Sequence, residues 1–180
     1  MERFLIPLAI LVLIVLVWAI TTGNRFRRMN VKIDESESGI DVALTKRYDT
    51  LTKMLDVTRG YAAHEVSTFE RVINLRQGMS IAEKNEANAE MDFIESRLNV
   101  LVENYPELRS SEVFAGLQAS INDAEAHLQA ARRLYNSNVS SFNQLLVTFP
   151  SSIIANMQNQ VAREFFLAEA HKRQDVQMTF

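Results

Sequence analysis

The chain has 180 residues, of which 47% are hydrophobic, a formal net charge of −3 and no cysteine. This length suits one membrane segment and one soluble domain. The slight acidic excess gives no basis for nucleic-acid binding, and the lack of cysteine excludes disulfides, thiolate catalysis and cysteine-based zinc sites. Five glycines and three prolines are few, and the aromatic and β-branched clusters typical of strands do not recur. We therefore predict an all-α protein.

Residues 1–29 are predicted to form a transmembrane anchor with a basic flank. The run from Phe4 to Ile20 carries no charge and, with the next three residues, is just long enough to span a bilayer. We expect lipid contacts at spaced positions along it, with the aromatic residue at the interfacial level: Phe4, Leu8, Leu11, Ile14 and Trp18. The competing interpretation is a cleaved signal peptide, but the apolar run is long and no A-x-A-like cleavage site follows it.

The charges that flank the anchor predict its orientation. Arg25, Arg27, Arg28 and Lys32 follow the apolar run, whereas only Arg3 and the amino terminus precede it. The positive-inside rule then places the carboxy-terminal side in the cytoplasm.

Residues 30–162 are predicted to form a bundle of long helices. From Val31 to about Gln77 the apolar residues recur at helical spacing: Ile33, Ile40, Leu44, Tyr48, Leu51, Leu55, Ala62, Val66, Phe69 and Ile73. Gly60 interrupts this helix either as a close approach of two backbones or as a tolerated weak point. Gly78 is predicted to form the turn that follows.

The second predicted helix runs from about Ser80 to Tyr105, with one apolar stripe: Ala87, Met91, Ile94, Leu98, Leu101 and Tyr105. Its charged residues, including Glu83, Lys84 and Glu95, are assigned to a solvated face. Pro106 ends this helix, and Ser110 or Ser111 is expected to cap the next one.

The third predicted helix, from about Ser111 to Thr148, has the longest apolar stripe, with steps of three and four residues: Phe114, Leu117, Ile121, Ala124, Leu128, Ala131, Tyr135, Phe142, Leu145 and Phe149. A short amphipathic helix is expected from about Ser152 to Ala162, and residues 163–180 are expected to form a partly ordered tail. Because short links favour antiparallel neighbours, we predict a single amino-terminal transmembrane helix followed by an elongated, antiparallel, up-and-down helical bundle.

The sequence contains no recognisable catalytic or metal-binding motif. His64, His127 and His171 form no H-E-x-x-H or i,i+4 pair, and no phosphate-binding or nucleophile motif occurs. The carboxylates lie at spacings typical of solvation and ion pairing. We therefore expect no enzymatic activity, no catalytic residues, no metal and no cofactor.

Five polar residues lie beside or within the apolar stripes: Arg47, Asp49, Arg132, Asn136 and Asn138. We favour hydrogen bonding between helices for this set, and the alternative is a ligand site. If they lie within reach of each other, Asp49 and the arginines would pair. Asn138 occupies a stripe position, where a buried asparagine commonly fixes register or partner choice.

Several stretches of the sequence resemble the LemA family of membrane-anchored helical proteins. They include Ile40 to Asp49 (IDVALTKRYD), Arg59 to Glu65 (RGYAAHE), Tyr105 to Arg109 (YPELR), Ala131 to Asn136 (ARRLYN) and Phe149 to Ala155 (FPSSIIA). Val139, Phe142, Asn143, Glu164 to Phe166 and Val176 to Phe180 also fit. The resemblance covers nearly the whole chain and is specific in combination.

The resemblance implies a membrane-anchored bundle in a bacterial envelope, here the cytoplasmic (inner) membrane, and no established activity. Relatives are associated with membrane organisation and with other membrane proteins, including a magnetosome-associated branch. The chain departs from the family at Thr50 to Leu55, where a proline-containing step is usual. It also departs at Phe142, which replaces a tyrosine.

Two functions follow as expectations. The first is a non-enzymatic scaffold that self-assembles or docks other membrane proteins, with membrane lipids as its surroundings. The short apolar segment would provide the contact surface: Ile153, Ile154, Met157 and Val161. The alternative is a signalling or adaptor module that senses a ligand through the polar positions of its bundle.

Overall fold

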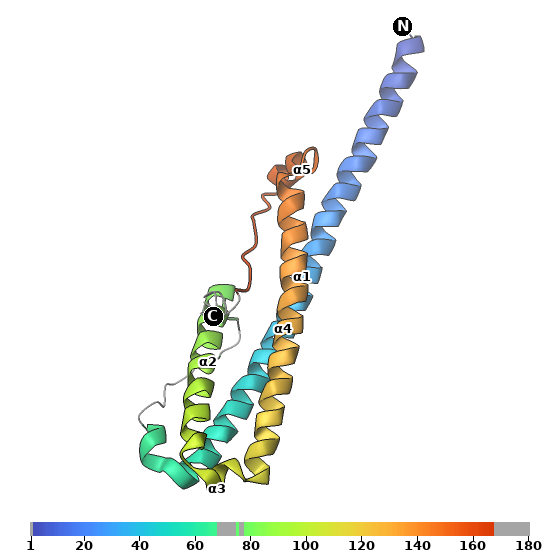
Figure 1. The fold of residues 1–180 in the computed structure, drawn as a ribbon. Coiled ribbons are helices and arrows are strands. Elements are labelled where there is room, and N and C mark those ends of the chain that lie inside the picture. The colour runs from blue at the N-terminus through green and yellow to red at the C-terminus, as the bar shows by residue number, and fades with distance from the viewer. Residues whose placement is uncertain (1, 68–74, 76–77, 168–180) are drawn as a thin grey trace, which may run out of the picture. The chain divides into compact units, whose positions relative to one another are not determined.

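The computed structural model describes residues 2–67, 75 and 78–167. The described chain forms the helices α1 (Glu2–Ser67), α2 (Ile81–Glu103), α3 (Pro106–Arg109), α4 (Glu112–Val147) and α5 (Ser151–Met157), shown in chain order in Figure 1. No strand occurs in these ranges, and the predicted all-α class is confirmed. Most of the predicted tail lies outside the described residues.

The chain divides into two compact units, and α1 and α4 contribute to both. The anchor unit comprises Met1–Glu37 and Leu134–Glu164, and the bundle unit comprises Ser38–Arg133 and Phe165–Phe180. The boundaries predicted from sequence, after residues 29 and 162, remain predictions.

The core of the bundle unit is formed by the apolar stripes of α1, α2 and α4. Most stripe positions are buried, including Ile40, Leu44, Leu51, Met91, Ile94, Leu98, Phe114, Ile121 and Leu128. Steps of three and four residues place such side chains on one helix face, and three faces of this kind bury one another. Thr58 of α1, a polar residue at helical spacing between the stripe positions Leu55 and Ala62, is also buried, and its hydroxyl donates to Met54 O at 2.7 Å.

The direction of α2 departs from the up-and-down order that the short-link argument predicted. Asp41 of α1 pairs with Lys84 at the start of α2, and Ala62 packs with Leu101 near its end. The earlier residue of α1 contacts the earlier residue of α2, and the later residue contacts the later one, so α1 and α2 run parallel. Helix α4 runs antiparallel to α1, because Lys46 meets Asp123 whereas Gly39 meets Ala131.

The number of residues between the two helices permits this departure. The described part of α1 extends to Ser67 and has non-helical dihedrals at Ala62, and the predicted end near Gln77 lies outside the described residues. Returning from Ser67 to the level of Asp41 takes roughly 39 Å at 1.5 Å per residue. Thirteen residues, the number between Ser67 and Ile81, can span at most roughly 45 Å, so a parallel α2 is possible. None of the described residues lies within 4 Å of a Cβ built on Gly60, so Gly60 marks no close approach of backbones among them.

Local sequence signals fix the starts of the next helices. Ser80 caps α2 in a capping box, in which Glu83 N donates to the serine hydroxyl and Ser80 N donates to Glu83 Oε2 at 2.8 Å. Gly78 has a φ of 77°, the left-handed region that glycine adopts freely. Phe114 N donates to Ser111 Oγ at 3.4 Å, so Ser111 provides the predicted cap of α4.

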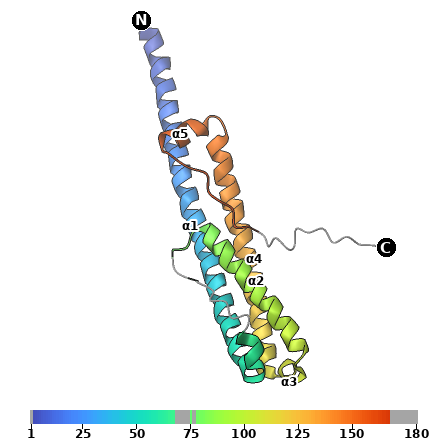
Figure 2. The ribbon, with the colours of Figure 1, turned by 90° about the vertical axis from the view of Figure 1, so that its left-hand side faces the viewer.

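In the anchor unit, the end of α4 packs antiparallel against α1, and α5 follows it (Figure 2). The rings of Phe26 and Phe142 meet edge to face at 5.8 Å. Helix α5 ends at Met157 rather than at the predicted Ala162. Asn159 has a φ of 51°, and this left-handed conformation ends the helix, since asparagine tolerates it better than most residues.

Candidate functional site

The first part of α1 is a candidate membrane span, long and apolar enough to cross a bilayer. The large apolar side chains from Leu5 to Ile20 are each between 51% and 66% exposed. Leu8, Leu11 and Ile14 are among them, whereas Trp18 is half-buried. The side chain of Phe4 lies outside the described residues. A helix segment with exposed apolar side chains all around it is unfavourable in water and favourable in lipid.

Just beyond this span, α5 packs onto α1 at a glycine. Thr22 and Gly23 are buried, and a Cβ at Gly23 would lie 2.6 Å from Gln158 Nε2 and 4.0 Å from Ile154 Cγ2. A Cβ at Gly23 would therefore have to displace the end of the Gln158 side chain, and any longer side chain there would also meet Ile154 of α5. Because Gly23 is only three residues past Ile20, α5 lies about 5 Å along the axis from the end of the apolar run.

Helix α5 and its flanks expose five apolar side chains, which we call the α5 patch: Val147, Phe149, Ile153, Met157 and Val161. Four of them are between 73% and 80% exposed, and Ile153 is 48% exposed. The sequence-based surface included Ile154, and this residue was misassigned. It is only 7% exposed because it faces Gly23 of α1.

The segment after α5, residues 158–164, is held to α1 and α4 by side chains for which the sequence analysis predicted no such contact. Asn143 Nδ2 donates to Arg163 O, and Arg163 N donates to Asn143 Oδ1, both at 2.9 Å. Asn30 Nδ2 donates to Gln160 Oε1 at 3.1 Å. An asparagine that pairs with both backbone groups of one residue acts as a clamp. Only the position of Asn143 beside the stripe residue Phe142 hinted at this role.

Tyr135 completes this attachment. Its hydroxyl donates to Glu164 O at 3.0 Å, and the residue is 1% exposed. Burial, followed by the nearby negative charge of Glu37, raises the pKa of Tyr135 to about 12. The phenol is therefore kept neutral, as the donor that this hydrogen bond requires.

In the bundle unit, Arg47 lies at the centre of a buried ionic cluster. Its side chain is 3% exposed and reaches Asp92 at 2.5 Å, Glu95 at 2.8 Å and Glu125 at 3.4 Å. Its Nη1 also donates to Asn88 Oδ1 at 2.7 Å. Burial alone would lower the pKa of Arg47, but the carboxylates outweigh it and the pKa is raised. The Nε atom has no acceptor among the described residues.

The other predicted polar positions of the bundle unit play no part in this cluster. Asp49 is exposed and is not among the partners of Arg47, so the suggested pairing does not form. The two residues are two positions apart on α1 and point in different directions. Arg132 is half-buried, with no salt bridge in the ranges described. Lys84, which was assigned to a solvated face, is buried and pairs with Asp41 at 2.7 Å.

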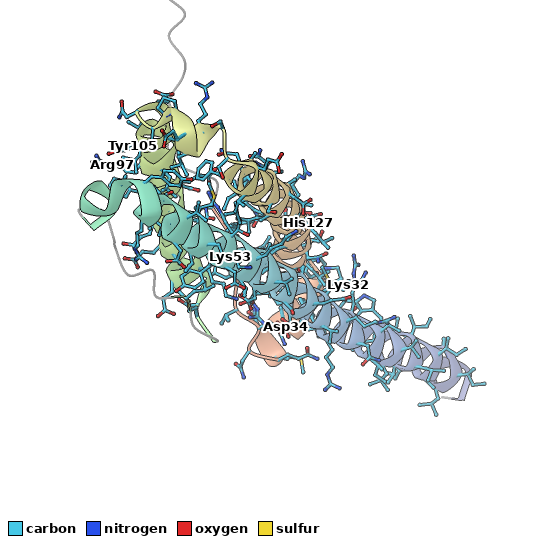
Figure 3. All side chains as sticks on the ribbon, turned by 90° about the horizontal axis from the view of Figure 1, so that it is seen from below. Lys32, Asp34, Lys53, Arg97, Tyr105 and His127 are labelled. Atoms are coloured by element: carbon cyan, nitrogen blue, oxygen red, sulfur yellow. The ribbon has the colours of Figure 1, made fainter. Side chains whose placement is uncertain are left out.

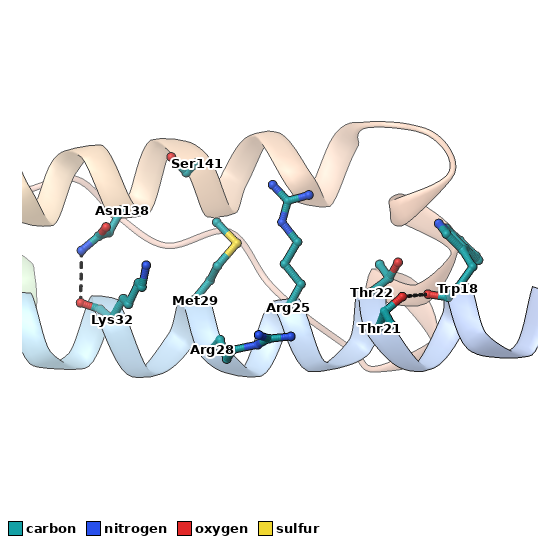
Figure 4. A pocket seen from close by; sticks show the side chains of 9 residues that line it. All are labelled: Trp18, Thr21, Thr22, Arg25, Arg28, Met29, Lys32, Asn138 and Ser141. Atoms are coloured by element: carbon teal, nitrogen blue, oxygen red, sulfur yellow. Dashed lines mark hydrogen bonds between the residues drawn. The ribbon is translucent and has the colours of Figure 1, made fainter.

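Asn136 and Asn138 belong to the anchor unit and are both half-buried. Asn138 Nδ2 donates to Lys32 O and to Ser36 Oγ, both at 3.2 Å. These bonds join α4 to α1, which agrees with the favoured interpretation of hydrogen bonding between helices. Asn138 also lines an open groove beside α1 (Figure 4).

The histidines and carboxylates of the described ranges show no metal-binding arrangement. No group of three or more histidine, aspartate or glutamate side chains is placed to hold a metal ion there. His127 is exposed on α4, with its imidazole 3.5 Å from Asp123 (Figure 3). The side chains of His64 and His171 lie outside the described residues.

Residues 36–180 match the LemA family. The chain belongs to the LemA family. A relative described as Protein LemA, from Metamycoplasma hominis, is 27% identical over 182 residues, which cover 97% of this chain and 83% of the relative. Neither description names a reaction, a ligand or a partner for these LemA proteins.

Proposed function

We propose that this LemA family protein is a non-enzymatic, membrane-anchored scaffold that self-assembles in the bacterial cytoplasmic membrane and docks other membrane proteins there. The observation that carries the proposal is the α5 patch, which exposes Phe149 and Met157 by at least 75%. Large exposed apolar side chains concentrated in one short segment commonly mark interaction surfaces.

The location of the patch favours a partner in the same membrane. Helix α5 contacts α1 at Gly23, beside the end of the apolar span. A second copy of the chain, anchored by the same span, would present its own α5 patch at the same depth. Two identical patches at one depth can form a symmetric contact in which each copy contributes the same residues.

The proposed orientation rests on the charges after the span. Arg25, Arg27 and Arg28 favour a cytoplasmic position for the carboxy-terminal domain. Because the chain has no cysteine, a thiol placed at the exposed Val100 of α2 would report this side uniquely. A membrane-impermeant maleimide should label Val100→Cys only after the cells are opened, and labelling of intact spheroplasts would place the domain outside.

The alternative, a signalling or adaptor module with a ligand in the polar core, draws less support. Arg47 is occupied by three carboxylates and Asn88 of the same chain, and Asn138 is used between α1 and α4. A ligand would have to displace these partners at a cost of a few kcal/mol. This alternative can be tested with a thermal-shift screen of small molecules. Compounds that reproducibly raise the melting temperature of the wild type, but not that of Asn138→Leu, would favour the alternative over the scaffold.

Self-assembly is tested by the particle mass of patch variants. We expect the double variant Phe149→Asp, Met157→Asp to lower the mass of the full-length protein in detergent, as measured by light scattering. The matched control carries Val42→Asp and Val100→Asp, which change two exposed apolar residues of the bundle unit. Equal masses for the two variants, with unchanged helicity, would exclude the α5 patch as the assembly surface.

A further inference from the structure

A groove beside α1 in the anchor unit is lined by basic and polar side chains that have no role in the proposed scaffold function. It measures about 650 Å³ and is lined by α1 residues from Trp18 to Lys32 and by Asn138 and Ser141 of α4 (Figure 4). Trp18, Arg25 and Lys32 are seven residues apart and therefore share one helix face. The residues that bind the 158–164 segment are not among those that line the groove.

The charges in this groove are all positive. Arg25, Arg28 and Lys32 line it, and no carboxylate does. In the ranges described, none of these three side chains forms a salt bridge. Among the described residues, the hydrogen bond made by their charged groups is the one that Arg28 Nε donates to Asn24 O at 3.4 Å. Three cations beside one cavity repel one another, and an anion between them would relieve that repulsion.

The other polar groups of the groove are acceptors. The hydroxyls of Thr21 and Ser141 donate to Trp18 O and Ser137 O of their own helices, so their oxygens remain able to accept. The amide nitrogen of Asn138 donates to Lys32 O and Ser36 Oγ, and its Oδ1 can accept a hydrogen bond from a ligand. Cationic donors with neutral acceptors nearby suit a phosphate that carries hydroxyl groups.

The depth of the groove matches the headgroup layer of a bilayer. Arg25 lies about 7.5 Å and Arg28 about 12 Å beyond Ile20 along the helix axis. The headgroup layer is roughly 5 to 8 Å thick on each side. Arginine can reach back toward the membrane along its apolar stem, and Trp18 is of the type that prefers this interface.

From this geometry we propose that the groove binds the headgroup of an anionic phospholipid with a hydroxylated headgroup such as glycerol. Arg25 and Arg28 hold the phosphate, and the oxygens of Asn138 and Ser141 accept hydrogen bonds from the headgroup hydroxyls. The proposal rests on the membrane anchoring proposed above, but not on self-assembly. It differs from a general attraction of basic residues to the membrane surface, because it names a site with two kinds of partner.

The single tryptophan of the chain lies in the groove and reports occupancy. The full-length protein in neutral detergent is titrated with phosphatidylglycerol while Trp18 fluorescence is recorded. We expect a saturable change with a midpoint at least tenfold lower than for phosphatidylcholine. Equal midpoints for the two lipids would overturn the proposal. Saturation by inorganic phosphate with displacement of the lipid would assign the groove to a free anion and overturn it as well.

A matched pair of variants separates the site from bulk charge. Arg25→Gln should raise the phosphatidylglycerol midpoint at least fivefold over wild type, and Arg27→Gln less than twofold, because Arg27 has the same charge but does not line the groove. Equal effects of the two variants would overturn the proposal. Native mass spectrometry counts bound lipids as a second readout, and far-UV circular dichroism verifies the fold. Light scattering on the same samples reports self-assembly separately, so either proposal can fail without the other.

Discussion

Replacing Arg47 with methionine should destabilise the bundle unit more than any other single charge removal in that unit. The substitution keeps a long apolar stem but leaves Asp92, Glu95 and Glu125 close together without their cation. Removing one partner of a buried ion pair costs about 3–5 kcal/mol. These carboxylates retain exposures of 21%, 21% and 24%, so water solvates them in part, and we expect the lower end, about 3 kcal/mol.

Thermal unfolding of the full-length protein in detergent, followed by circular dichroism, measures this effect. At about 2–4 °C per kcal/mol for a chain of this size, the midpoint should fall by about 6–12 °C. Lys46→Met is the matched control. It removes the neighbouring cation, but Lys46 and its partner Asp123 are both about half exposed, where ion pairs contribute little.

Two results would refute this reasoning. One is an Arg47→Met variant that melts within about 2 °C of the wild type, and the other is a loss no larger than that of Lys46→Met. Adding Asp92→Asn and Glu95→Gln to Arg47→Met should restore part of the stability, because it removes two of the stranded charges. A triple variant less stable than Arg47→Met would show that the repulsion is not the cause.

Three further predictions concern the anchor unit. In a spectrophotometric titration of the four tyrosines, one ionisation should occur near pH 12, and it should be absent from the titration of Tyr135→Phe. The pKa of Tyr135 in the folded protein lies above the ordinary value of about 10, so Tyr135 should stabilise the fold below pH 10 and lose that contribution between pH 10 and 12. A titration curve that Tyr135→Phe leaves unchanged near pH 12 would contradict this. Asn143→Leu should lower the free energy of unfolding by about 1–3 kcal/mol, because it leaves Arg163 N and O without their hydrogen bonds to Asn143. It should also speed amide hydrogen exchange at residues 160–164. Unchanged exchange would mean that Asn143 does not hold this segment in place. Gly23→Leu should lower the free energy of unfolding by about 1–3 kcal/mol because the new side chain would displace α5. The control Gly60→Ala, in the bundle unit, meets no described neighbour and should raise the free energy of unfolding by up to about 1 kcal/mol. Equal melting temperatures for these two variants would contradict the close packing at Gly23.

The sequence was sufficient for the helices and their buried faces. The three- and four-residue steps at Ile121, Ala124 and Leu128 identified core positions that are buried in the structure. Periodicity reports which face of a helix is apolar, and that information is local. Ser110 or Ser111 was predicted as the cap of α4 from equally local chemistry, and Ser111 provides it.

The direction of α2 and the fate of the charges could not be read in this way, because both depend on which helix lies opposite. Lys84 looked like part of a solvated face, and only the parallel packing of α1 and α2 places Asp41 beside it. Arg47 stood next to Asp49 in the sequence, yet its partners come from α2 and α4. The sequence does not distinguish Ile154 from Ile153. In the structure Ile154 is buried because it faces Gly23 of α1, whereas Ile153 is exposed.

The mass of the full-length protein in detergent, measured by light scattering and corrected for bound detergent, tests the scaffold proposal most directly. We predict a homogeneous particle of at least two chains that becomes smaller in the Phe149→Asp, Met157→Asp variant. A wild-type particle with the mass of one chain, at concentrations where the anchor is fully solubilised, would contradict self-assembly through the α5 patch.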